Sequence, residues 1–350
     1  MNVHTSFALG IRKVNRTKRM IVFAWLLNVL LALVVAAPML GLLNEAIAPT
    51  VMEERLLEQL DLNWIETFRA DRPNNPIAQM LLPSRLGAPP FYEHLDQVIN
   101  GATVTSIGRF LGSLFFEFRV NTNELDLAAV IMMLYVLLWT YLSGAFVGIY
   151  AREHRSSFTE FLQLGARYFG KFFRLVLIQV VVYFVLFLLV EWVSRNIRVW
   201  TANEPSELTA FVYFMIRNAG VIVMIGLITL LFDYAKIRMV VDTRVSAVAA
   251  FGAGIRFVVT HPVRTVLLAL ILAVLGAVLA ATFVLLEQQI VQSTFWTIFL
   301  VFVLQQLYVW SRQWLRAAYY ATQTALYQAS TRVRETESAA ANGVVGVTGV

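Results

Sequence analysis

The residues of this chain that could carry chemistry are polar side chains inside long apolar runs. Arg217 lies nine residues into an apolar run at 208–232. An arginine at the centre of a membrane-spanning helix costs about 2.5–3.5 kcal/mol on insertion scales. Glu191, near the end of the preceding run, is the carboxylate at the closest depth, so we expect a Glu191–Arg217 ion pair. Such a pair would clamp two helices together or contact a substrate.

Three amide side chains also lie within apolar runs: Asn28, Gln179 and Gln305. Each can hydrogen-bond to a neighbouring helix, worth about 0.6 kcal/mol within a membrane. Asp233 stands three residues before Lys236, which predicts a local ion pair.

Motifs of known catalytic or metal sites are absent from the sequence. It holds no HExxH, Walker A, GxSxG or CxxC pattern, and none of its four histidines has a second histidine at ligand spacing. Cysteine is absent, which excludes a disulfide framework, a thiolate metal site and a cysteine nucleophile. We therefore predict no catalytic residue, no metal site and no cofactor.

Composition places the chain in a membrane. Hydrophobic residues make up 59% of it and charged residues 14%, where a soluble protein carries about a quarter. Crossing a bilayer core of about 30 Å takes about 20 helical residues. The apolar runs predict an all-α polytopic protein with six transmembrane helices, at residues 20–43, 127–150, 172–193, 208–232, 266–286 and 294–315.

Basic residues predict the orientation of these spans. The N-terminal stretch, the second and fourth connections and the C-terminal segment hold 19 of the 28 lysines and arginines. By the positive-inside rule, both termini and these two connections face the cytoplasm. Because the basic residues flank apolar runs on alternate sides, the net charge of +6 predicts anionic lipid headgroups as partners and not nucleic acid.

A similar pattern precedes each odd-numbered span. A phenylalanine, a Gly-x-Arg and a later arginine recur as Phe7, Gly10, Arg12 and Arg19; as Phe161, Gly165, Arg167 and Arg174; and as Phe251, Gly254, Arg256 and Arg264. This recurrence predicts three units, each an amphipathic cytoplasmic helix followed by a helical hairpin. In 158–173, Arg167 and Lys171 lie off the apolar stripe, so such a helix would lie flat at the interface. The predicted headgroup contacts are Arg12, Arg167, Lys171 and Arg256.

Two segments differ from the six-span domain at 1–330. Residues 44–126 form a predicted extracytoplasmic insertion with helices at about 51–70 and 102–118, and it carries 12 acidic and six basic residues. The segment 71–76, with two prolines, ends the first of these helices. Residues 331–350, rich in Ala, Gly and Val, predict a disordered tail.

The run DYAKIRMVVD at 233–242, followed by Ser246, Ala250, Gly254 and His261-Pro262, resembles a pattern in uncharacterised bacterial six-span membrane proteins. It is also similar to the membrane domain attached to some glycerophosphodiester phosphodiesterases. The likeness covers residues 160–330. The chain has no catalytic phosphodiesterase domain, so that activity does not carry over, and the resemblance implies a bacterial inner-membrane location.

Three classes of function are compatible with these features. The first is a non-catalytic membrane protein, either a subunit or organiser of a membrane complex or a lipid-contacting factor. The absence of catalytic motifs and the lipid-facing connecting helices favour it. The second is a transporter or channel-like protein with a site between the hairpins, which the repeat favours. The third is a membrane-embedded enzyme, which should show clustered His, Asp or Glu near one membrane face.

Overall fold

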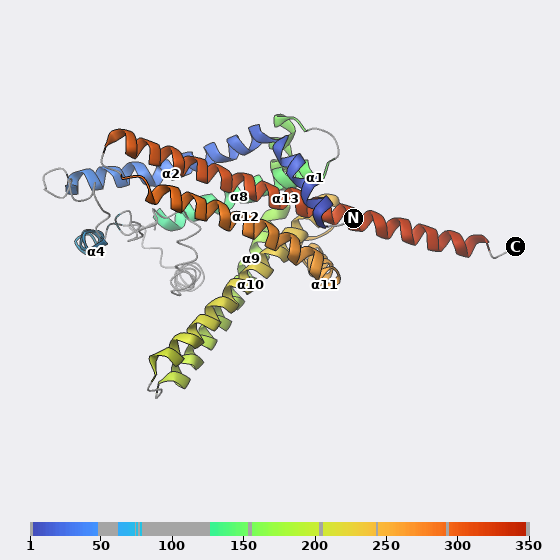
Figure 1. The fold of residues 1–350 in the computed structure, drawn as a ribbon. Helices are drawn as coiled ribbons and strands as arrows, with labels where there is room; N and C mark the ends of the chain where they lie inside the picture. Colours follow the sequence, from blue (N-terminus) through green and yellow to red (C-terminus); the bar gives the residue numbers. More distant parts are fainter. Residues whose placement is uncertain are drawn as a thin grey trace.

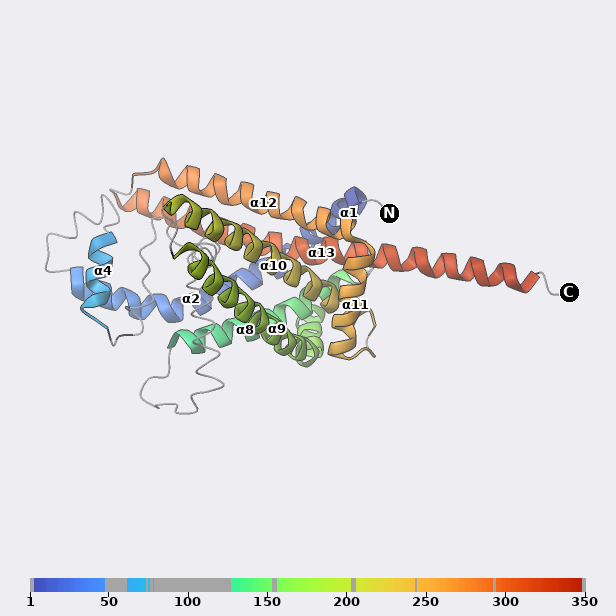
Figure 2. The same cartoon turned by 90° about the horizontal axis from the view of Figure 1, so that it is seen from below.

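The computed structural model describes residues 3–47, 62–73, 75, 78, 127–152, 156–202, 206–242, 244–291 and 294–347, and within these ranges it is all-α. The helices run in the order α1 (Val3–Asn15), α2 (Lys18–Ile47), α4 (Leu62–Ala70), α8 (Leu127–Tyr150), α9 (Phe158–Thr201), α10 (Glu207–Val241), α11 (Ala247–Thr260), α12 (Pro262–Gln288) and α13 (Phe295–Val347). The N-terminus lies at one end of the molecule, beside α1 and α11, and α13 continues outward past this same end toward the C-terminus (Figures 1 and 2). We call this the N–C end.

Several helices have the length and apolarity to cross a membrane. In the described ranges there are four, lying in α8, α9, α10 and α12. A fifth is obtained if α1 and the first part of α2, which are bent by 72° at a short break, form one span. These helices indicate a multi-pass membrane protein. The count of six spans stays a prediction.

Local sequence explains where the helices begin and end. At α9, the Ser157 hydroxyl accepts from the Glu160 amide at 3.1 Å, and the Glu160 carboxylate accepts from the Ser157 amide at 2.9 Å, which completes a capping box. At α11, the Ser246 hydroxyl accepts from the Ala249 amide. Pro262 is the first residue of α12, where a missing N–H costs nothing, so α11 and α12 separate at His261.

The second predicted interfacial helix differs from the other two. α1 and α11 are separate short helices, as predicted, but 158–173 continues into the following span as the 44-residue helix α9. At 1.5 Å per residue α9 is roughly 66 Å long, about twice the thickness of a bilayer core. The expectation that 158–173 lies flat as a helix of its own is therefore wrong. No proline or polar turn interrupts 169–174, so nothing stops the helix there.

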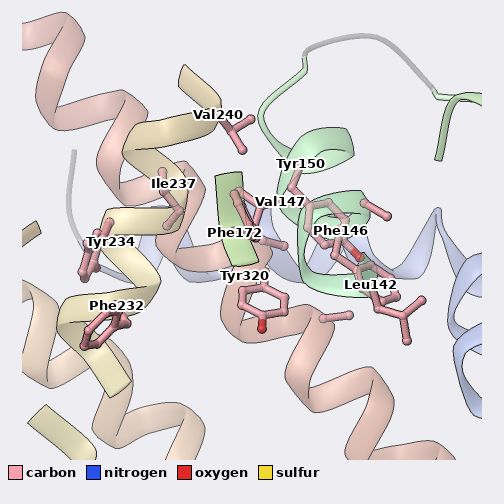
Figure 3. Close-up of a cluster of buried hydrophobic side chains, with 14 of the residues drawn as sticks. Leu142, Phe146, Val147, Tyr150, Phe172, Phe232, Tyr234, Ile237, Val240 and Tyr320 are labelled. Atoms are coloured by element: carbon pink, nitrogen blue, oxygen red, sulfur yellow. The ribbon is translucent and has the colours of Figure 1, made fainter. Parts of the chain in front are cut away.

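The core lies at the N–C end, where α8, α10 and α13 contact one another. Large fully buried side chains from these helices and from α9 meet there, among them Phe146, Tyr150, Phe172, Phe232 and Tyr234 (Figure 3). Toward the opposite end, which we call the loop end, α9 and α10 leave the other long helices (Figure 1). Their apolar side chains, such as Val185 and Trp192, are exposed there. A membrane helix exposes such side chains to lipid.

The long helices pair unequally. α9 packs along α10, and α12 packs along α13. α2 shares few contacts with α8 and more with α13, so the first predicted hairpin is not a close pair. The polypeptide between α2 and α8 includes α4, which lies within the predicted helix at 51–70. The predicted helix at 102–118 lies outside the described residues. α13 continues as a helix to Val347, past residue 330 where a disordered tail is predicted.

Three glycines bring the amphipathic segments against the core helices. A Cβ on Gly10 of α1 would meet Thr322 of α13, and one on Gly165 of α9 would meet the Tyr141 ring of α8 at 2.7 Å. A Cβ on Gly254 of α11 would meet the Leu231 carbonyl oxygen of α10 at 2.7 Å. Each contact is closer than a side chain permits, so these approaches require glycine.

Gly254→Ala should therefore destabilise the protein, because the new methyl group meets backbone that cannot rotate away. We expect a loss of about 1–3 kcal/mol, the usual cost of overpacking. The matched control is Gly252→Ala in the same helix, where a Cβ meets nothing within 4 Å. That change should stabilise by up to about 1 kcal/mol through helix propensity. Denaturant unfolding in detergent measures both, and equal stability of the two variants would contradict the packing role of Gly254.

Candidate functional site

A charged pair lies inside the core at the N–C end. The Lys236 Nζ is 3.4 Å from the Asp233 Oδ1, and the two side chains are 12% and 9% exposed. The predicted local ion pair is therefore confirmed. Desolvating two charges costs several kcal/mol for each ion, which their mutual attraction only partly returns. A buried ion pair with this cost points to a role other than packing.

Two side chains of α13 and one of α8 extend this pair. The Arg316 guanidinium lies 3.9 Å from the centre of the Trp139 ring and hydrogen-bonds to Tyr320. The Lys236 ammonium lies 5.8 Å from the centre of the Tyr320 ring. Tyr320 therefore stands between the two cations. It lies between the labelled side chains of α10 and those of α8 (Figure 3).

Cations outnumber carboxylates in this cluster. Arg312 precedes Arg316 by one helical turn, with its guanidinium 5.9 Å from the centre of the Tyr308 ring. The two arginines lie close enough to repel each other. In the described part of the chain, Asp233 is the one carboxylate found to act on Arg316 or Arg312. We call Asp233, Lys236, Arg312, Arg316 and Tyr320 the core charge cluster.

Several buried polar atoms among the described residues of α8, α10 and α13, the helices that carry the core charge cluster and Trp139, lack a hydrogen-bond partner. In the described residues, the buried atoms that lack a hydrogen-bond partner include Trp139 Nε1, Tyr234 OH, Gln313 Oε1, Gln323 Oε1 and Thr324 Oγ1. Gln313, Tyr320 and Thr324 follow one another by seven and four residues, which places them along one stripe of α13. Buried polar groups without partners are rare in folded proteins and call for a ligand, a water or an ion.

Tyr319, next to this stripe, serves a structural role. Its hydroxyl donates to the Ala269 carbonyl at 3.2 Å and so joins α13 to α12. Burial, with the nearby Asp233 carboxylate as a further cause, raises the pKa of Tyr319 to about 12. The hydroxyl therefore keeps its proton and the hydrogen bond beyond the pH at which an exposed tyrosine ionises.

The predicted Glu191–Arg217 ion pair is wrong. The Arg198 Nη2 lies 3.2 Å from the Glu191 Oε1, two turns along the same helix. Arg217 instead donates to the Ser194 hydroxyl at 2.9 Å and to the Asn218 Oδ1 at 2.7 Å. It still joins α10 to α9, so the role as a clamp between helices is retained with a neutral partner.

The three predicted amides are not joined to Arg217 by any described contact. Asn28 donates to the Ala24 carbonyl of its own helix at 2.8 Å. Gln305 hydrogen-bonds to Glu287 and so joins the loop ends of α12 and α13. Gln179 is half-buried in α9. The core charge cluster was missed because Arg312 and Arg316 look like ordinary basic residues that flank a span.

The predicted headgroup residues lie at the N–C end. Arg12, Arg167 and Arg256 are exposed, and Lys171 is half-buried. Each of the three arginines stands two residues after the glycine that contacts a core helix. Two shallow hollows lie near these residues. One, of about 580 Å³, is on α1 and is lined by Arg12 and Arg16. The other, of about 350 Å³, is at the α11–α12 junction and is lined by Arg264. No group of three or more metal-ligating side chains occurs among the residues described.

Comparison with known proteins assigns no family to the chain. No family model matches it, and searches of curated proteins and of solved structures find no significant match. The resemblance over residues 160–330 stays a prediction.

Asp233→Asn should destabilise the protein strongly, because it leaves the Lys236 ammonium buried without its counter-ion. We expect a loss of about 3–5 kcal/mol in the free energy of unfolding. The double variant with Lys236→Met should recover part of this loss. Asp242→Asn is the control, because the Arg238–Asp242 pair is 32% and 38% exposed and such pairs contribute about 0–1 kcal/mol. A loss for Asp233→Asn no larger than for Asp242→Asn would exclude a buried pair.

Proposed function

We propose that the protein is a non-catalytic integral membrane protein that contacts lipid, binding anionic phospholipid headgroups at the cytoplasmic face of a bacterial inner membrane. The observation that supports this most is the common position of Arg12, Arg167 and Arg256. All three are exposed, and each follows by two residues a glycine packed on a core helix. A rigid layer of cations at one membrane surface attracts anionic headgroups by about 1 kcal/mol per residue.

A threefold internal repeat accounts for that common position. In the proposed arrangement, the amphipathic segment of each unit packs on the returning helix of the preceding unit. α9 packs on α8 and α11 on α10, and α1 packs on α13 to close the ring. The three glycine contacts lie at these three interfaces. The repeat supports six spans in three units, of which the first carries the insertion between α2 and α8.

Apolar residues on the outer parts of α9 and α10 support the broader role as a subunit or organiser of a membrane complex. Val181, Val185, Ile216 and Val223 are more than half exposed there. These surfaces fit lipid or another transmembrane helix equally well. Lipid binding is therefore the more specific proposal.

Replacing Arg12, Arg167 and Arg256 together by Gln should reduce the retention of anionic lipid. At about 1 kcal/mol each, the three changes amount to a loss of about 100-fold in affinity. The measurement is the ratio of phosphatidylglycerol to phosphatidylcholine that stays bound when the full chain is purified from mixed nanodiscs. The control carries Arg195→Gln and Arg198→Gln at the loop end. Equal retention by wild type and triple variant would refute the proposed function.

Site-directed labelling tests the proposed orientation, and the natural lack of cysteine removes background. Ala202→Cys and Gln289→Cys, both exposed at the loop end, should react with an impermeant maleimide on intact cells. Thr5→Cys and Val248→Cys, exposed at the N–C end, should react only after permeabilisation. Labelling of Thr5→Cys on intact cells would place the N-terminus outside and contradict the positive-inside argument.

A further inference from the structure

We propose that Arg316 binds a phosphate group, with Lys236 and Arg312 supplying further positive charge. The phosphate is that of an inner-leaflet phospholipid or free inorganic phosphate. This site goes beyond the proposed function, because it uses none of the exposed arginines of α1, α9 and α11. Its residues come from α8, α10 and α13, which contact one another in the core.

Arg316 is accessible to solvent or lipid, and the side chains beside it are buried. The residue is exposed, whereas Trp139, Tyr320 and Gln313 beside it are 6%, 3% and 9% exposed. Its guanidinium stacks on Trp139 at 3.9 Å and bonds to Tyr320. A guanidinium held in this way has five N–H groups in its plane, and one bond to Tyr320 leaves others for a ligand. Two parallel N–H groups match two phosphate oxygens.

The charge balance favours an anion. Within the described part of the chain, the core charge cluster has three cations and one carboxylate, and Asp233 already pairs with Lys236. A phospholipid phosphodiester would compensate one of the remaining two positive charges, and dianionic inorganic phosphate would compensate both. Without a ligand, Arg312 and Arg316 repel each other one turn apart on α13. Metal cations are disfavoured by the same balance.

Two buried polar groups near Arg316 lack a hydrogen-bond partner within the described ranges. Trp139 Nε1 and Gln313 Oε1 are buried atoms without a hydrogen-bond partner among the described residues. Trp139 is the ring on which Arg316 lies, and Gln313 is one turn before Arg316 on the same helix. A protein that only packed its core would fill these positions with apolar side chains. Their retention beside an open arginine is consistent with a site that binds a ligand or its water.

The level of Arg316 relative to the interface suits a lipid phosphate. Trp314 Nε1 donates to the Asn15 Oδ1 at 3.0 Å, which ties this part of α13 to the end of α1. Arg316 therefore lies at the depth where the amphipathic helix α1 meets α2. Phosphate groups of the inner leaflet are found at that depth when α1 lies at the interface.

The test titrates the full-length protein with two probes and follows tryptophan fluorescence, because a ligand on Arg316 changes the environment of Trp139. One arm uses sodium phosphate in maltoside micelles, and the other uses phosphatidylglycerol in phosphatidylcholine nanodiscs. Saturation in the first arm identifies free phosphate as a ligand. Saturation only in the second identifies the lipid headgroup. In whichever arm saturates, Arg316→Gln should weaken binding by about tenfold or more, and the exposed-cation control Arg195→Gln at the loop end should leave it unchanged.

Three further variants separate a loss of binding from a loss of folding, of the fluorescence signal or of the exposed arginines. Arg316→Lys retains a charge without the planar fork, so it should fold and bind with intermediate affinity. Trp139→Phe should remove the fluorescence change while a phosphate-induced rise in melting temperature persists. The triple Gln variant at positions 12, 167 and 256 should still bind at Arg316, which separates this site from the proposed function. No saturable binding in either arm, or equal binding by wild type and folded Arg316→Gln, overturns the proposal.

Discussion

Close approach between helices at three glycines is the constraint on which the rest of the structure depends. Gly10, Gly165 and Gly254 let the amphipathic segments rest directly on α13, α8 and α10. A Cβ added at any of them would lie within 3 Å of an atom of the neighbouring helix, so the contact would have to shift. Because these contacts fix the segments on the core helices, Arg12, Arg167 and Arg256, two residues further on, each have the same position relative to the glycine contact. In a bilayer, where lipid tails are as apolar as the helices, such packing supplies much of the association energy.

The core helices carry an additional cost that packing alone does not explain. Phe146, Phe232 and Tyr234 form an apolar core at the same end at which Asp233 and Lys236 bring charge inside and the exposed Arg316 packs on Trp139. A charge pair buried among aromatic rings contributes little to stability after desolvation. Its surplus of positive charge and the orphaned polar atoms nearby are costs that a bound anion would offset. In the two proposals, the cluster and the exposed arginines of α1, α9 and α11 therefore bind the same kind of ligand, an anion.

Helix continuity differs among the three amphipathic segments. α1 and α11 end at a turn and at His261-Pro262, whereas α9 passes through the equivalent place without a break. Breaks depend on single residues that remove a backbone donor or favour a turn. The segment 158–173 lacks such a residue, so it follows the direction of the rest of α9. This difference accompanies the departure of α9 and α10 from the other long helices at the loop end (Figure 1).

The amino-acid sequence by itself determined the all-α class, the long apolar helices, the absence of cysteine chemistry and the position of the basic residues beside the apolar runs. These follow from periodicity and composition, which act within about 20 neighbouring residues. The Asp233–Lys236 pair was also predictable, since it needs one turn of one helix.

Tertiary structure decided which distant groups meet. Glu191 pairs with Arg198 of its own helix, although Arg217 is on the helix packed beside it. α2 packs more closely on α13 than on α8. The Trp314 Nε1 donates to the Asn15 Oδ1, 299 residues away in the sequence. Such choices depend on how whole helices pack, and no local pattern encodes the direction in which a helix leaves its neighbour. The core charge cluster is of this kind, because Trp139, Lys236 and Arg316 come from three helices that only packing brings together.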